Sequence, residues 1–249
     1  SLHVEHAAVA LAAGRRVLVE KPLGLAGDDL SPLLAPAVAD RVAVAFNLRF
    51  HRPLVRLAEV AASAAVGRIS SVALWFGSWL PDWRPGTDYR AGYSARAALG
   101  GGVLHDAIHE LDVLLWLVGD GDYRVRGAVV DRLGPLEIDV EDTVAAVLQG
   151  PGGVCATIRL DYLSRRYRRG VEVIGEHGAV RLDWARSVLE VEDADGVRTE
   201  PAGDPVDRSY ERQASAFLEW VAGGPALPVG AALGARSVAL VAAIRAAAA

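Results

Sequence analysis

The sequence predicts an α/β layer with a parallel sheet, followed by an α+β domain with one large, mostly antiparallel open sheet and helices on one face. Over the first 46 residues helix and strand patterns alternate, and both strands are short apolar runs of the kind buried in parallel sheets. Further on, strand patterns follow one another with Gly and Pro between them at hairpin spacing, which is typical of antiparallel sheets. We therefore expect two parts, 1–46 and 47–249.

The elements of the first part follow from their apolar patterns. Residues 3–13 are apolar at roughly helical period and stop at Gly14, a common helix terminator. The run "RVLVE" (16–20) predicts a buried strand, residues 28–39 a second helix, and "RVAVAF" (41–46) a second strand. This order predicts that the two strands lie parallel.

The second part contains more strands than helices. Residues 54–65 and 103–118 predict helices, and a polar, aromatic connection of the kind that often carries function, 78–102, lies between the strand 69–77 and the second of these helices. Two further helices, 207–222 and 230–248, close the chain. The remaining predicted strands are 123–130, 142–149, 153–162, 170–175, 178–184 and 187–193.

Composition restricts the classes of function. A net charge of −5 argues against a nucleic-acid partner, and no charge-free apolar run is long enough to predict a membrane span. The single cysteine, Cys155, rules out an internal disulfide and favours a reducing, cytoplasmic setting.

The tripeptide Glu20-Lys21-Pro22 contains the only lysine of the chain. It follows a predicted parallel strand, and α/β sheets bind ligands outside the carboxyl ends of their strands. A lysine placed there can lose part of its hydration, which lowers its pKa and suits it to donate to a substrate oxygen. Glu20 is placed to hold it, and Pro22 to fix the turn through a cis bond. From these three residues alone, an ordinary surface lysine is the simpler interpretation.

The helix predicted over 103–118 places His105, His109, Asp112 and Trp116 on one stripe. The rest of this helix is apolar and therefore buried, so the stripe pairs internally or faces a cleft in which a histidine relays protons. The alternatives are structural histidines and a zinc hydrolase site, since "HDAIH" differs from H-E-x-x-H only by Asp106 in place of Glu. No third ligand follows at a familiar spacing, so we rank zinc below proton relay.

The connection at 78–102 and the basic run "SRRYRR" (164–169) are candidate ligand contacts. Aromatic and arginine side chains of the connection suit stacking on rings and binding hydroxyls or phosphates. The alternatives are a polar lid with no specific ligand and a solvated strand end. The side chains concerned in the connection are Trp83, Arg84, Tyr89, Arg90 and Tyr93.

Taken together, these segments resemble the Gfo/Idh/MocA family of NAD(P)-dependent oxidoreductases. The resemblance runs in order through "LHVEHAAVALAAGRRVLVEKPL", "FNLRFHRPLVR", "LPDWRPGTDYRAGYSAR", "GGGVLHDAIHELDVLLWLVG" and "ERQASAFLEWVAGG". It implies that 1–46 is the C-terminal part of a Rossmann domain, and that 47–249 is the family's substrate and oligomerisation domain. It further implies an NAD or NADP cofactor, a sugar, cyclitol or sugar-nucleotide substrate, and a homo-oligomer formed through the open sheet.

The resemblance also implies roles for single residues. Lys21 would hydrogen-bond the reacting oxygen beside the nicotinamide, and His109 would be the general acid and base, oriented or tuned by Asp106 or Asp112. The family often has the acid four residues before the histidine, where this chain has His105. The implied cofactor contacts are His3, Glu20, Lys21, Asn47, Trp83 and Arg84. The implied substrate contacts are Arg49, His51, Tyr89, Tyr93 and Arg166.

The glycine-rich phosphate loop of a dinucleotide-binding fold is not found in the sequence. The runs "GGG" (100–102), "GDG" (119–121) and "GPGG" (150–153) do not match G-x-G-x-x-G between a strand and a helix. We therefore expect either a piece of a longer protein or a natural product that holds NAD(P) weakly. The alternative function is a catalytically silent binding or assembly module of the same fold.

Overall fold

The computed structural model describes residues 2–248. The N-terminal part begins with α1 (His3–Ala12), β1 (Val17–Val19), α2 (Ser31–Leu34) and β2 (Val42–Val44). β1 and β2 pair in parallel, as predicted. Their carboxyl ends therefore open on the same edge, where Lys21 and Asn47 follow.

The helix predicted over 28–39 is wrong in its length. Only α2 is α-helical in this segment, and a single turn of 3₁₀ helix, Ala39–Arg41, precedes β2. The cause is Pro36, because a residue before proline avoids the helical region. Ala35 is extended accordingly, with φ −58° and ψ 132°.

The second part is built on an eight-stranded sheet with the order β10-β9-β8-β7-β3-β6-β5-β4. All neighbours are antiparallel except β3 and β6, which lie parallel. The strands are β3 (Ile69–Gly77), β4 (Arg124–Asp131), β5 (Thr143–Gln149), β6 (Cys155–Asp161), β7 (Arg168–Gly175), β8 (Ala179–Asp183), β9 (Val188–Asp193) and β10 (Gly196–Pro201). β10 is not among the predicted strands, because its short sequence is mostly polar and largely exposed.

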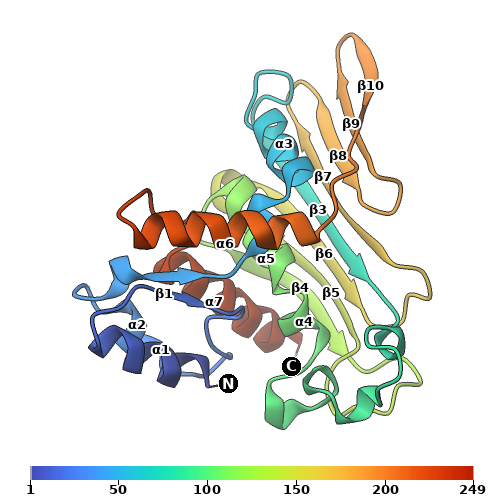
Figure 1. Ribbon diagram of the computed structural model, residues 1–249. Helices are drawn as coiled ribbons and strands as arrows, with labels where there is room; N and C mark the ends of the chain where they lie inside the picture. Colours follow the sequence, from blue (N-terminus) through green and yellow to red (C-terminus); the bar gives the residue numbers. More distant parts are fainter. Residues whose placement is uncertain (1, 249) are drawn as a thin grey trace.

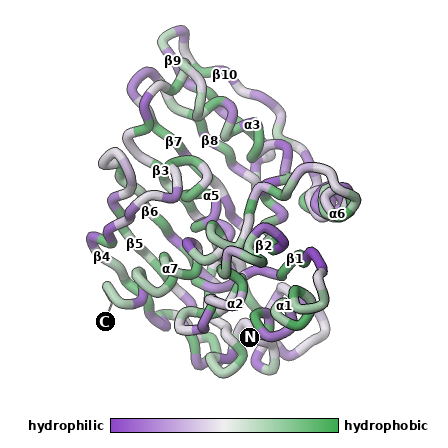
Figure 2. Tube along the Cα trace, turned by 90° about the vertical axis from the view of Figure 1, so that its left-hand side faces the viewer, coloured by the Kyte–Doolittle hydropathy of each residue, from purple (hydrophilic) through white to green (hydrophobic). Residues whose placement is uncertain are grey.

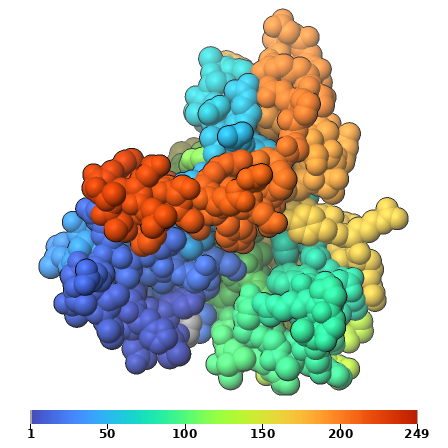
Figure 3. All heavy atoms as spheres, viewed as in Figure 1, coloured from blue at the N-terminus to red at the C-terminus, as the bar shows by residue number. Residues whose placement is uncertain are grey.

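Helices cover one face of this sheet, as predicted (Figure 1). They are α3 (Arg52–Ala61), α5 (Ile108–Val118) and α7 (Ala231–Ala248), with the short α4 (Val103–Asp106) leading into α5. α6 (Asp207–Val221) lies across the molecule above the N-terminal residues and the long connection (Figure 3). Hydrophobic and hydrophilic residues alternate along the strands in Figure 2, because alternate side chains face the helices.

α7 joins the two parts of the chain. By length and composition alone it is able to cross a membrane. In the fold, however, its Val241 and Ile244 are buried, and it packs against β4, α5 and β2. Close approach to the N-terminal part requires Gly234, where an added Cβ would lie 2.6 Å from a methyl group of Val44. The C-terminal helix therefore holds the β1–β2 unit against the large sheet.

Candidate active site

The turn after β1 carries Lys21 into the interior. Its Nζ donates a hydrogen bond to the main-chain oxygen of Asp106, 2.9 Å away. The Lys21–Pro22 peptide bond is cis, as predicted. Burial lowers the pKa of Lys21, and the charge of Arg169 lowers it further, against the opposing charge of Asp106. Lys21 is therefore a partly desolvated hydrogen-bond donor and not a freely solvated surface lysine.

The helix predicted over 103–118 is broken in the middle. α4 ends at Asp106 and α5 begins at Ile108, because Ala107 takes φ −93° and ψ 28°. The NH of Glu110 donates to the carbonyl of Ala107, 3.1 Å away, rather than one residue earlier. The carbonyl of Asp106 is thus left for Lys21. The break also corrects the predicted stripe, since residues before and after it no longer share one regular helical face.

His109 lies on the α5 side of this break. It is buried, and its ring meets the ring of Phe46 edge-on at a centroid distance of 5.5 Å. Among the described residues nothing hydrogen-bonds its Nδ1. Burial holds the pKa of His109 well below its usual value, and the charges of Lys21 and Arg169 lower it further. A neutral imidazole beside a lysine is suited to accept a proton.

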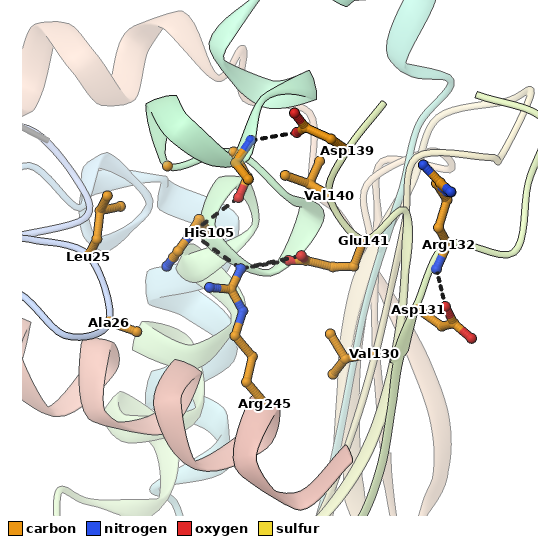
Figure 4. A pocket seen from close by; sticks show the side chains of 13 residues that line it. Leu25, Ala26, His105, Val130, Asp131, Arg132, Asp139, Val140, Glu141 and Arg245 are labelled. Carbon is orange, nitrogen blue, oxygen red and sulfur yellow. Dashed lines mark hydrogen bonds and ion pairs between the residues drawn. The ribbon is translucent and has the colours of Figure 1, made fainter. Parts of the chain in front are cut away.

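His105 lies in different surroundings. Its Nδ1 is 3.3 Å from the carbonyl oxygen of Gly101 and 3.5 Å from Nη2 of Arg245, which pairs with Glu141 at 3.1 Å. These side chains line a cavity of about 670 Å³ (Figure 4). Across residues 2–248, no group of three or more His, Cys, Asp or Glu side chains is arranged to hold a metal ion. We therefore develop no zinc site from His105 and His109.

The carboxylate of Asp106 lies close to two tyrosine side chains. The hydroxyl of Tyr162 donates to its Oδ2 at 2.6 Å, in the interior. Burial and the charge of Asp106 raise the pKa of Tyr93 and hold that of Tyr162 well above its usual value. Both phenols therefore keep their protons and face a carboxylate. Tyr93, an implied substrate contact, remains 41% exposed at the edge of this cluster.

Asp112, the alternative candidate for orienting His109, is paired with Arg49. Nε of Arg49 lies 2.8 Å from its Oδ2, and Nη2 lies 2.9 Å from its Oδ1, in a buried two-point ion pair. The guanidinium also lies over the ring of Trp116 at 4.7 Å. The carboxylate oxygens of Asp112 are thus engaged by Arg49, and a role for Asp112 in orienting His109 stays a prediction. The Arg49 groups that would bind a substrate are engaged by Asp112 in this structure.

Glu110 and Tyr162 are not among the predicted site residues, and Arg169 is included only as part of the candidate basic run 164–169. Arg169, at the start of β7, forms a buried ion pair with Glu110, with Nε 2.7 Å from Oε1 and Nη2 3.1 Å from Oε2. Burial raises the pKa of Glu110, and Arg169 opposes that rise. The implied substrate residue of the same basic run, Arg166, is exposed on the loop before β7. The signals for Arg169 are its place in that basic run and its position immediately before a predicted apolar strand.

The long connection brings aromatic side chains to the same region. β3 and β6 are parallel and end side by side at Gly77 and Asp161, so the segments that follow them meet. Trp83 meets Tyr162 edge-on, with ring centroids 5.3 Å apart, and its Nε1 is buried with no partner among the described residues. Arg84 lies over the ring of Tyr93 at 5.1 Å.

Three other implied contacts are held by distant parts of the chain. Nδ2 of Asn47 donates to Oγ of Ser209 at 2.7 Å. Nε2 of His51 lies 3.0 Å from the main-chain oxygen of Asp204, and its ring stacks on Trp184. The hydroxyl of Tyr89 accepts from the NH of Glu137 at 3.2 Å. These three side chains tie loops together in this structure.

A cavity at the edge of β1 fits one end of a dinucleotide. Nδ1 of His3 lies 2.7 Å from the main-chain oxygen of Pro22, and Glu20 is exposed. Both line a cavity of about 200 Å³ beside β1. Its position at the end of a parallel strand, next to Lys21, fits the nicotinamide end of such a cofactor. Residues 2–248 contain no glycine-rich loop between a strand and a helix for its pyrophosphate.

The chain is similar in sequence to known proteins of one family. The family model for the GFO/IDH/MocA C-terminal domain matches residues 54–181. The dTDP-3,4-didehydro-2,6-dideoxy-alpha-D-glucose 3-reductase of Streptomyces violaceoruber is 31% identical over 217 residues, 82% of this chain and 60% of that protein. Levoglucosan dehydrogenase of Pseudarthrobacter phenanthrenivorans is 27% identical over 257 residues, 92% of this chain and 61% of that protein. The chain thus spans about three fifths of these relatives.

Solved structures extend the likeness to the whole described fold. Levoglucosan dehydrogenase in complex with NADH and levoglucosan superposes with a TM-score of 0.83 at 26% identity, covering 99% of this chain and 75% of that one. GenD2 from gentamicin A biosynthesis, in complex with NAD, gives 0.80 at 26% identity, covering 100% and 73%. With the family model matching just over half of its residues, the chain belongs to the GFO/IDH/MocA family.

Proposed function

We propose that the protein is an NAD(P)-dependent oxidoreductase that transfers a hydride between nicotinamide and a hydroxyl or ketone of a sugar-like substrate. The observation that carries this proposal is the placement of Lys21 after a parallel strand, where its Nζ bonds the main-chain oxygen of Asp106 at 2.9 Å, three residues before His109 in the chain. The charge of Lys21 lies close enough to His109 to lower the pKa of that imidazole. A cationic donor beside a neutral base is what the oxidation of an alcohol requires.

Each residue of the site has its own role in the proposed reaction. Lys21 donates to the reacting oxygen and stabilises the negative charge that grows on it. In the direction of oxidation, neutral His109 accepts the hydroxyl proton, and in reduction it returns that proton. A bound nicotinamide would supply the acceptor or donor of the hydride. His3, Glu20 and Trp83 are the side chains that would hold it.

The substrate class rests on the relatives and on the polar side chains near Lys21. Relatives and neighbours at 25–31% identity carry names of enzymes that act on levoglucosan or a dTDP-linked sugar. Tyr93 and Asp106 supply the hydroxyl and carboxylate groups with which polyhydroxylated substrates hydrogen-bond. A sugar, cyclitol or sugar nucleotide is therefore the proposed substrate class.

Direct binding tests this function. The full-length protein is titrated with NADH and NADPH, and then assayed with levoglucosan, L-sorbose and a dTDP-sugar in both directions. The proposal expects dissociation constants in the micromolar range, roughly 1 µM to 1 mM, and turnover of at least one compound. Failure to bind either cofactor would refute it and favour the silent binding module.

We also propose a homo-oligomer formed through the open face of the sheet. This face carries small and apolar side chains around a shallow depression of about 700 Å³, including Trp75, Ala145 and Val147. Val147 is 42% exposed and Val129 49%. Exposed apolar area of this kind favours association, and a second copy presents the same surface.

A further inference from the structure

Two hydrogen bonds from opposite sides of the fold meet on Asp106. From the N-terminal part, Nζ of Lys21 donates to its main-chain oxygen at 2.9 Å. From the large sheet, the hydroxyl of Tyr162 donates to its Oδ2 at 2.6 Å. One residue at the break between α4 and α5 thus links the lysine to the sheet.

The main-chain oxygen of Asp106 is available only because the helix is broken. In a continuous helix this oxygen would accept the NH of Glu110. Here that NH donates to Ala107 instead. A carbonyl at a helix break has no neighbour in its own helix to hold it, so its direction depends on how the rest of Asp106 is held.

Tyr162 is placed to hold it. It is fully buried, its NH donates to the carbonyl of Asp142 at 2.8 Å, and its carbonyl accepts the NH of Leu80 at 3.1 Å. Its ring packs edge-on against Trp83. The backbone and ring are therefore fixed, and the hydroxyl has one direction in which to point. A short bond from a phenol to a carboxylate is among the stronger neutral-to-ion hydrogen bonds.

We propose that Tyr162 is a positioning residue for the oxidoreductase reaction: by holding the Asp106 carboxylate it fixes the Asp106 carbonyl, and this carbonyl holds Lys21 in place. The inference rests on the proposed function for its catalytic meaning, but the chain of contacts is testable without turnover. It requires no bond to form or break in Tyr162. Displacement of a catalytic group by about 1 Å costs on the order of 10²-fold in rate.

Lys21 reports on this arrangement directly, because it is the only lysine in the chain. Protein labelled with ¹³C and ¹⁵N in lysine alone gives a single ε-methylene signal by NMR, and its titration gives the pKa of Lys21. The charged groups that face Lys21 come from its own turn, from both halves of the broken helix and from β7. They are Glu20, Asp106, Glu110 and Arg169.

Two variants at the two ends of the Tyr162–Asp106 hydrogen bond are expected to shift this titration in opposite directions. Tyr162→Phe keeps the ring and the Asp106 charge but releases Asp106, so Lys21 gains water and its pKa rises by about 0.5 or more toward the ordinary value. Asp106→Asn keeps an oxygen for Tyr162 and the position of Lys21 but removes an opposing charge, so the pKa falls. The control is Tyr123→Phe, which removes a hydroxyl bonded to the carbonyl of Gly119 and leaves the signal unchanged.

The outcomes are decisive in either direction. An unchanged or lowered pKa of Lys21 in Tyr162→Phe overturns the proposal. A raised pKa of Lys21 in Asp106→Asn also overturns it, and this variant is the test by itself if Tyr162→Phe does not fold. Where the binding assays identify a substrate, Tyr162→Phe is expected to lower kcat roughly 10- to 100-fold while the Kd for the cofactor stays within about twofold. If no substrate turns over, the NMR result still decides the positioning role.

Discussion

Replacement of Arg49 by leucine is expected to destabilise the fold far more than the loss of a surface ion pair. In the pair between Arg49 and Asp112, the two side chains are 6% and 1% exposed. The variant keeps the Asp112 carboxylate in the interior and removes the two nitrogen atoms that bond to it. It also removes the cation above Trp116.

The magnitude follows from what is left behind. A buried ion pair adds little net stability, but removal of one partner leaves an uncompensated charge and costs about 3–5 kcal/mol. The double variant Arg49→Leu/Asp112→Leu removes that charge and is expected to recover more than half of this loss. The control is Arg56→Ala, which breaks a pair with Glu200 whose side chains are 47% and 32% exposed and costs about 0–1 kcal/mol.

Urea unfolding followed by tryptophan fluorescence gives these free energies. Burial already raises the pKa of Asp112 above its ordinary value, with Arg49 opposing the rise. In Arg49→Leu the folded protein therefore binds this proton more tightly than the unfolded chain, so part of the lost stability returns as the pH falls through the raised pKa. A loss in Arg49→Leu no larger than in Arg56→Ala would refute the reasoning.

Three further outcomes are expected. Burial lowers the pKa of His51 and of His105, and holds that of His109 well below its usual value. The unfolded chain therefore binds more protons than the folded protein below pH ~6.5, and thermal unfolding is expected to show stability falling as the pH falls through this range. A stability that does not change with pH contradicts the burial of these rings. In the full-length protein, Lys21→Ala and His109→Ala are each expected to lower kcat by roughly 10²- to 10⁴-fold with little change in cofactor Kd, and wild-type turnover in either removes its catalytic role. Val147→Glu is expected to convert an oligomer into a monomer in light-scattering measurements, because it places a charge on the open face, and an unchanged mass locates the interface elsewhere.

Most of the strands can be predicted from local patterns of apolar residues. The two apolar runs of the N-terminal part form β1 and β2, and β3 through β9 lie at or near the predicted positions, because alternation and apolar runs report which backbone faces are buried. The helix predicted over 28–39 failed at Pro36, a local signal that outweighs periodicity. The polar β10 is paired only because β9 lies beside it.

The residues of the candidate site also differ in how far the sequence identifies them. Lys21 and His109 are candidates from their placement, a lone lysine after a buried strand and a histidine in an apolar helix, but their roles come from the family resemblance. Tyr162 is not identified from the sequence, and Arg169 only as part of a basic run, because each reaches the site through the pairing of β6 and β7 with β3. The break at Ala107 is equally invisible, since a regular helical period continues through it.

The sequence by itself therefore determined the order of the elements and the open sheet, which depend on local periodicity, and its family resemblance singled out Lys21 and His109. Only the tertiary structure decided which charged groups are paired: Asp112 with Arg49, Glu110 with Arg169, and Asp106 with Lys21 and Tyr162. The physical reason is that a buried charge takes the partner that folding brings within hydrogen-bond distance, and these partners lie 56 to 85 residues apart in the chain.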